Sequence, residues 1–171
     1  MDRHSASRIA VMQGSYVVAC LGLMALRLMP HHLRPGGWPA PDLVISLTFA
    51  WVLRRPEHVP LLLVVAIGLL SDLLYQRPPG PMAALIVLAS DVLRGRGLTP
   101  RPLMPMMEWG LVAILCLGMT LAHWAILGVT LVPQPALRYE LWQAAMTILS
   151  YPLVVAALRA SGIRKPDLAK A

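Results

Sequence analysis

The sequence predicts an all-α, polytopic integral membrane protein, with about six transmembrane helices in one compact bundle. Hydrophobic residues make up 57% of the 171 residues and charged residues only 13%, whereas soluble domains average about 45–50% and about 25%. Several apolar runs approach the roughly 20 residues that a helix needs to cross a hydrocarbon core of about 30 Å. Prolines stand at nearly every junction between these runs, where loops and first helical turns tolerate them.

Six apolar segments are expected to be helices, because backbone groups in lipid must be hydrogen-bonded within their own segment. They cover residues 9–29, 42–53, 59–75, 81–93, 107–132 and 140–158. Together they form a single membrane domain over residues 1–171, and its last part, 159–171, is a short basic tail.

Prolines and basic residues bound the first three segments. The run at 9–29 follows a basic start and has no small-x-small cleavage site after it, so an uncleaved first span is expected. The run at 42–53 covers only ~17 Å as a helix. It either crosses as a short helix or is re-entrant, and a re-entrant segment leaves five spans. The run at 59–75 has Pro60 in its first turn and ends before Arg77.

The last three segments follow turns that contain proline or glycine. The run at 81–93 opens with Pro81 directly after Gly80, and the run at 107–132 is the longest. The run at 140–158 contains Pro152, which is expected to kink this helix or to mark a helix-packing site.

The basic residues indicate six spans with both termini cytoplasmic. The net charge of +7 is spread between the apolar runs rather than along one face, which points to membrane topology and not to nucleic acid. The inner set is Arg3, Arg8, Arg54, Arg55, Arg94, Arg96, Arg101, Arg159, Arg164, Lys165 and Lys170, and the outer set is Arg34, Arg77 and Arg138. Arg27 can snorkel from the first span. Eleven against three is a strong bias, and five spans give ten against four. The tail is expected to meet anionic lipid or to dock a partner.

Asp72 is an acidic residue inside a predicted span, where an ionisable group costs at least about 2.5–3.5 kcal/mol near the centre. Gly68, Asp72 and Tyr75 share a helix face by their spacing. We expect Gly68 to allow the close approach of a neighbour, and Asp72 to accept hydrogen bonds from the following turn or from Arg77. The alternative is a proton or ion relay, or a ligand contact. A structural role is favoured, because no lysine, histidine or second carboxylate is expected at the same depth.

Asp91 lies in the next segment and is expected near its inner end, far from Asp72, with Arg94 as a local partner. A catalytic carboxylate pair is therefore not predicted. Cys20, Cys116 and His123 lie within apolar runs and are expected to be buried structural residues. No metal-ligand spacing, phosphate-binding motif or nucleophile–base pair occurs, so catalytic, metal and cofactor residues are not predicted.

The length, the six-helix layout and the stretch 40–93 resemble the bacterial rod shape-determining protein MreD family. Within that stretch a G-x-x-x-D-L-L motif precedes a short polar turn and a glycine that opens the next helix. The stretch "ILSYPLVVAALRASG" is similar to the family's closing helix. The matching positions are Gly68, Asp72, Leu73, Leu74, Gly80, Tyr151 and Pro152. The doubled proline before Gly80 departs from the family's usual turn.

The resemblance implies a non-enzymatic membrane scaffold of the bacterial elongation machinery in the inner membrane. Its partner would be MreC, and through MreC the chain would reach MreB, a SEDS glycan polymerase and a class B transpeptidase. The candidate structural or partner-surface residues, from the residues and the resemblance together, are Gly68, Asp72, Arg77, Gly80, Asp91, Tyr151 and Pro152.

The family's fold also looks like that of the substrate-binding subunits of energy-coupling-factor (ECF) vitamin transporters. The alternative function is therefore a small-molecule-binding membrane subunit. Against that alternative, the presumed outer loops offer few polar groups that could converge on a vitamin.

Overall fold

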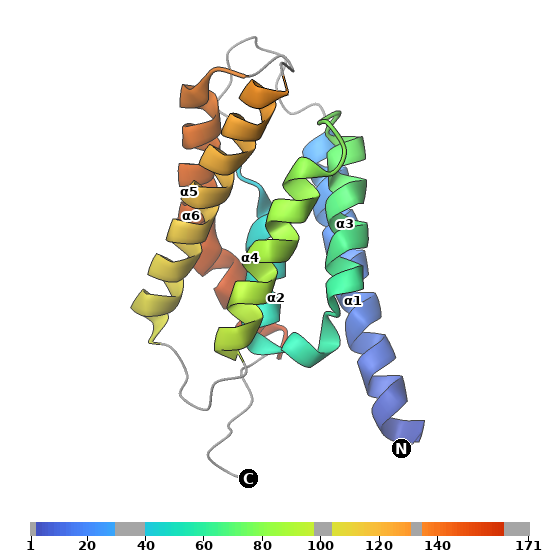
Figure 1. Ribbon diagram of the computed structural model, residues 1–171. Coiled ribbons are helices and arrows are strands. Elements are labelled where there is room, and N and C mark those ends of the chain that lie inside the picture. The colour runs from blue at the N-terminus through green and yellow to red at the C-terminus, as the bar shows by residue number, and fades with distance from the viewer. Residues whose placement is uncertain (1–2, 30–39, 98–103, 131–134, 163–171) are drawn as a thin grey trace.

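The computed structural model describes residues 3–29, 40–97, 104–130 and 135–162, and all secondary structure in these ranges is helical (Figure 1). The helices are α1 (Arg3–Leu28), α2 (Leu43–Arg54), the short 3₁₀ helix η1 (Pro56–His58), α3 (Leu61–Leu74), α4 (Pro81–Gly97), α5 (Pro105–Val129) and α6 (Leu137–Ala160). The predicted all-α class is confirmed, and each of the six expected segments coincides with one α-helix. The basic residues Arg34, Arg101, Arg164, Lys165 and Lys170 lie outside the described residues.

The six α-helices alternate in direction along the bundle. In Figure 1, α5 and α6 form the left side, α1 and α3 form the right side, and α2 and α4 lie between them. The end with the α3–α4 turn, where α2 and α6 also begin, is called the hairpin end below. The opposite end, where α1 begins and α6 finishes, is called the terminal end.

Helix α2 runs through the centre of the bundle. It packs against α1, α4 and α6, and every residue from Val44 to Arg54 is buried. This continuous helix runs antiparallel to α1 and in the same direction as α4 and α6 (Figure 1). Other helices surround α2, so its side chains contact protein rather than lipid. A helix of 12 residues is long enough for that position.

The molecule is an α-helical membrane protein by the length and composition of its helices. Three helices are long and apolar enough to cross a bilayer by themselves: Ile9–Leu28, Pro105–Val129 and Leu137–Ala160. Helices α2 and α3 are apolar but shorter. This number is lower than the six spans expected, because α2, α3 and α4 have only 12, 14 and 17 residues.

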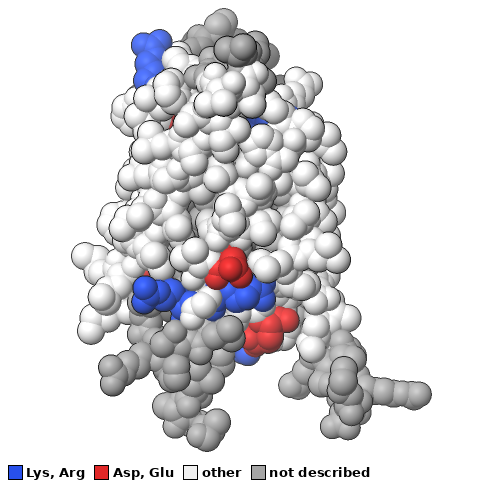
Figure 2. Space-filling view, viewed as in Figure 1, with Lys and Arg blue, Asp and Glu red and all other residues white. Residues whose placement is uncertain are grey.

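The described surface is apolar around its middle. Large exposed side chains include Val18 on α1, Leu69 on α3, Ile114 on α5 and Leu153 on α6. Figure 2 shows the matching charge distribution on one face, with charged side chains gathered toward the two ends and a central belt free of them. This outward apolar belt is what a bilayer requires, since lipid offers no partner to exposed polar groups.

Helices α3 and α4 pack closely at Gly68. A Cβ atom at this position would lie 3.1 Å from both the Cα and the Cβ atoms of Ala83. The close approach expected of Gly68 is therefore confirmed, and α4 is the neighbour. The backbone of Ala83 cannot rotate away as a long side chain would, so the two helices would have to separate to admit even a methyl group.

We expect Gly68→Ala to lower the stability of the protein by about 1–3 kcal/mol, the usual cost of overpacking. Membrane abundance and the midpoint of thermal unfolding in detergent measure this effect. Gly118→Ala on α5 is the matched control, because no atom lies within 4 Å of a Cβ atom there. Equal behaviour of the two variants would contradict the close packing of α3 on α4.

Candidate functional site

Asp72 joins α3 to the start of α4. Its side chain is fully buried, and its Oδ2 atom accepts hydrogen bonds from the backbone N–H groups of Gly80 and Ala83, each at 3.1 Å. The first N–H groups of a helix lack partners within the helix, and a negative charge there also complements the helix dipole. Asp72 therefore caps α4 from a different helix, and the expected hydrogen bonds from the turn are present.

The α3–α4 turn has two residues in left-handed backbone conformations. Gln76 has φ of 54° and follows the last residues of α3, while Gly80 has φ of 111° directly before Pro81. The second value is strained for any residue with a Cβ atom, so glycine is required at position 80. This conformation turns the Gly80 N–H group toward Asp72.

Arg77, the alternative donor expected for Asp72, lies elsewhere, and the expected pairing of Asp91 with Arg94 is wrong. Arg77 lies 3.7 Å from the carboxylate of Asp42, and not on Asp72. Asp91 is exposed on α4 and forms no ion pair with a described residue. Arg94 instead donates hydrogen bonds to the carbonyl groups of Pro56 and Val59. The carbonyl groups of the α2–α3 connection lack regular helical partners, and they draw the guanidinium away from Asp91.

A buried charge cluster lies at the terminal end. The Arg54 Nη1 atom is 3.0 Å from the Glu108 Oε1 atom, and the Tyr151 hydroxyl donates a hydrogen bond of 2.6 Å to that same oxygen. Arg54 is 1% exposed, Glu108 3% and Tyr151 2%. Arg54 also donates to the carbonyl oxygen of Ala50 at 2.8 Å. The cluster ties the end of α2 to the start of α5 and to the middle of α6.

Sequence reasoning did not find the roles of Arg54 and Glu108. The sequence places Arg54 only in the inner set of basic residues. It singles out Tyr151 only as part of the aromatic–proline pair with Pro152. A usable signal was present, because Glu108 is an acidic residue at the start of a long apolar run. Such a residue needs a partner when it is buried.

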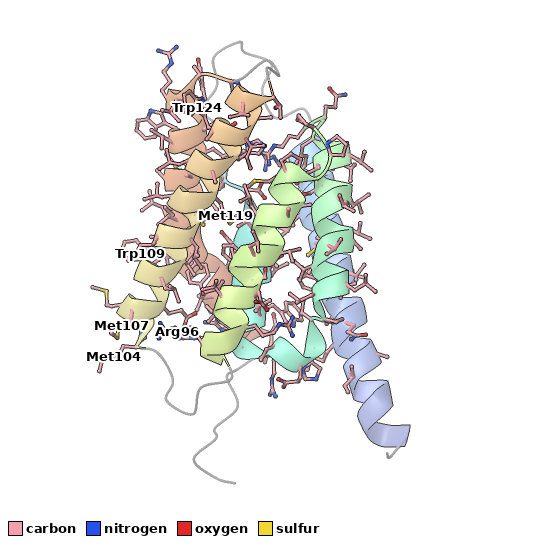
Figure 3. The ribbon with its side chains drawn as sticks, viewed as in Figure 1. Arg96, Met104, Met107, Trp109, Met119 and Trp124 are labelled. Carbon is pink, nitrogen blue, oxygen red and sulfur yellow. The ribbon has the colours of Figure 1, made fainter. Side chains whose placement is uncertain are left out.

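Pro152 marks a contact between α5 and α6. Proline has no N–H group, so the carbonyl of Ile148, four residues earlier, loses its partner within the helix. The indole Nε1–H group of Trp109 donates a hydrogen bond of 2.9 Å to this carbonyl. Figure 3 shows Trp109 on the lower half of α5, beyond Met104 and Met107. Of the two roles expected for Pro152, the packing site is the one that this contact supports.

Trp109→Phe should lower stability by about 1 kcal/mol, because it removes the donor and leaves the Ile148 carbonyl unpaired. Pro152→Ala restores a backbone N–H group that can bond this carbonyl inside α6. In the Pro152→Ala background the further change Trp109→Phe should therefore cost much less. Thermal unfolding of the four proteins in detergent measures the coupling, and strictly additive effects would contradict this role for the indole.

A second polar cluster lies at the hairpin end. Asp42 caps α2, and its Oδ2 atom lies 2.9 Å from Arg27 and 3.7 Å from Arg77. The Arg27 contact is an ion pair without a hydrogen-bonding angle. Arg27 stacks 4.2 Å from the centre of the Tyr75 ring, and the Asp42 N–H group donates to the Thr147 hydroxyl at 2.8 Å.

This end of the bundle contains a cavity of about 630 Å³. Its polar lining residues are Arg27, Tyr75, Gln76, Arg77, His123, Tyr139, Glu140 and Gln143. Few such groups are expected from the outer loops, and the polar groups that meet here lie mostly on helices. The groups come from α1, from the end of α3 and the turn that follows it, and from α5 and α6, rather than from long loops, so the linear sequence did not show that they meet.

Within the described residues, no three His, Cys, Asp or Glu side chains are placed to share a metal ion. Cys20 and Cys116 are both buried as free thiols. What the arrangement can do is join helices, through Asp72 at one end and Glu108 at the other, and hold a polar group in the cavity.

No protein-family model matches the chain, and no solved structure gives a significant match. Among curated proteins the chain is similar to G-protein coupled receptor 62 of Homo sapiens, with 42% identity over 103 residues. The match covers 59% of this chain and 23% of the receptor. The chain thus spans less than a quarter of the receptor's length, and the receptor's activity is not transferred to it.

Proposed function

We propose that this chain is a non-enzymatic membrane scaffold of the bacterial elongation machinery, which supports side-wall peptidoglycan synthesis by binding an MreC-type partner. The observation that supports this most is the capping of α4 by Asp72. A carboxylate that accepts two backbone hydrogen bonds at full burial has a structural role, and it sits in the part of the chain that resembles the MreD family. The hairpin residues Gly68, Asp72 and Gly80 then shape a surface for partners.

Depletion of the protein in a rod-shaped host tests this proposal. Cells should become round and lyse, because side-wall synthesis loses its membrane anchor, and uptake of vitamins should be unchanged. Re-expression of the intact chain is the control. Rescue of the growth defect by a supplied vitamin would contradict the scaffold function.

A small-molecule-binding membrane subunit is the second candidate, and the cavity at the hairpin end favours it. In that case the chain would work with the energy-coupling subunits of a transporter, and MreC-type partners would be absent. Genomic context separates the two candidates at once, since an adjacent gene for an MreC-like protein favours the scaffold and adjacent ATPase genes favour the transporter.

We further propose that the chain crosses the bacterial inner membrane six times, with both termini in the cytoplasm. The alternating helices support this topology, as does the position of Arg54, Arg94 and Arg159 near the terminal end. Alkaline phosphatase fused after Ala171 should be inactive, and the same enzyme inserted after Pro79 should be active. An active fusion at Ala171 would contradict the proposed topology.

A further inference from the structure

The cavity at the hairpin end has the size of a ligand site. Its volume of about 630 Å³ lies within the range of roughly 300–1,000 Å³ that small-molecule pockets occupy. A second space of about 30 Å³ adjoins it and shares Arg77, His123, Glu140 and Gln143 with it. Met119, labelled on α5 in Figure 3, belongs to the wall of this inner space. These four shared polar residues therefore lie between the larger cavity and the core of the bundle.

His123 shows that a polar partner is missing from this wall. Its side chain is only 4% exposed, and its Nε2 atom has no hydrogen-bond partner among the described residues. About nine in ten buried polar groups have such a partner. His123 lines both spaces, so a ligand in the cavity could supply the missing bond.

The charges around the cavity are balanced but separated. Arg27 and Arg77 both approach the single carboxylate of Asp42, which leaves one positive charge in excess on that side. Glu140 on α6 lines the same cavity and forms no ion pair with a described residue. A simple anion would meet Glu140, and a simple cation would meet the two arginines. A molecule with both charges would satisfy both sides.

We propose that the cavity binds a small zwitterion, whose acidic group contacts Arg77 and whose primary ammonium group contacts Glu140. His123 and Gln143 supply further hydrogen bonds to the bound group. Two sources carry this chemistry, the head group of phosphatidylethanolamine and a free solute such as phosphoethanolamine. Leu28, Leu74 and Leu127 in the wall offer apolar surface to the part of a lipid nearest its head group.

Binding to the full-length protein, purified in detergent and stripped of lipid, tests the proposal independently of the scaffold function. The probes are phosphatidylethanolamine, phosphatidylglycerol, phosphatidylcholine and soluble phosphoethanolamine. Phosphatidylethanolamine should bind at least about tenfold more tightly than the other two lipids, because only its head group pairs a phosphate with a primary ammonium. A response to phosphoethanolamine without any lipid preference would support the same site with a free solute as its ligand.

The variant Glu140→Gln should weaken binding of the zwitterion about tenfold. It should not weaken binding of anionic phosphatidylglycerol, because it removes a charge that repels this lipid. Glu140→Asp, which keeps the charge, should retain the preference even if its affinity falls. The matched control is Glu57→Gln, an exposed glutamate in η1 near the other end of the bundle. Unchanged binding of phosphatidylethanolamine by Glu140→Gln would overturn the proposal. So would a wild-type protein that binds phosphatidylglycerol as tightly as phosphatidylethanolamine and ignores phosphoethanolamine.

Discussion

Glu108→Leu is expected to remove most of the protein from the membrane. The change leaves the guanidinium of Arg54 buried without its carboxylate, and it removes the acceptor of the Tyr151 hydroxyl. Breaking a buried ion pair by deleting one partner costs about 3–5 kcal/mol, and the whole stability of a domain is only about 5–15 kcal/mol. Immunoblots of membrane fractions and thermal unfolding in detergent measure the loss.

The double variant Arg54→Met, Glu108→Leu separates the buried charge from a simple loss of volume. Replacing both charges by apolar residues of similar size is often neutral, so the double variant should accumulate better than Glu108→Leu alone. Glu57→Leu is the matched control, because this glutamate side chain is 50% exposed. A double variant no better than the single one would show that the Arg54–Glu108 pair is not what Glu108→Leu disrupts.

Asp72→Leu is the second large expected effect. It leaves the N–H groups of Gly80 and Ala83 without an acceptor at the start of α4, and each unsatisfied buried donor costs about 1–3 kcal/mol. Asp72→Asn keeps one oxygen at nearly the same volume, and that oxygen can accept both hydrogen bonds. Abundance should therefore fall for Asp72→Leu and stay near the wild-type level for Asp72→Asn.

A proton or ion relay at Asp72 predicts the opposite pattern. Neither Asn nor Leu titrates in the accessible pH range, so both variants would lose function equally while the protein accumulated normally. Cell shape and membrane abundance, measured together for the two variants, distinguish these roles. Glu57→Gln is the control, since the Glu57 side chain is 50% exposed and lies outside the hairpin contacts. Normal abundance with full loss of function in Asp72→Asn would contradict the capping role.

The helices and the Asp72 contact could be predicted from sequence because both depend on local information. Apolar runs bounded by prolines define the helices, and the bonds from Gly80 and Ala83 to Asp72 join residues within one hairpin. Even the Gly68 contact follows from the spacing of Gly68 and Asp72 on one face of α3. Short loops bring antiparallel helices side by side, so these contacts need no knowledge of the rest of the bundle.

The Arg54–Glu108–Tyr151 cluster and the cavity could not be predicted in the same way. In a membrane protein the core and the lipid are both apolar, so the hydrophobic pattern does not show which face of a helix points inward. The rotation of α5 and α6 decides whether Glu108, Tyr151 and His123 are buried, and that rotation depends on packing against α2 and α4. The pairing of Arg94 with Asp91 failed for a related reason, because more distant carbonyl groups competed for the guanidinium.

Affinity purification of the tagged full-length protein from native membranes in mild detergent tests the scaffold function most directly. An MreC-like bitopic membrane protein should co-purify with the wild-type chain and with the control Glu57→Gln, and it should be depleted with Asp72→Leu even after correction for abundance. Co-purification of energy-coupling ATPase subunits in the absence of an MreC-like protein would contradict the scaffold function.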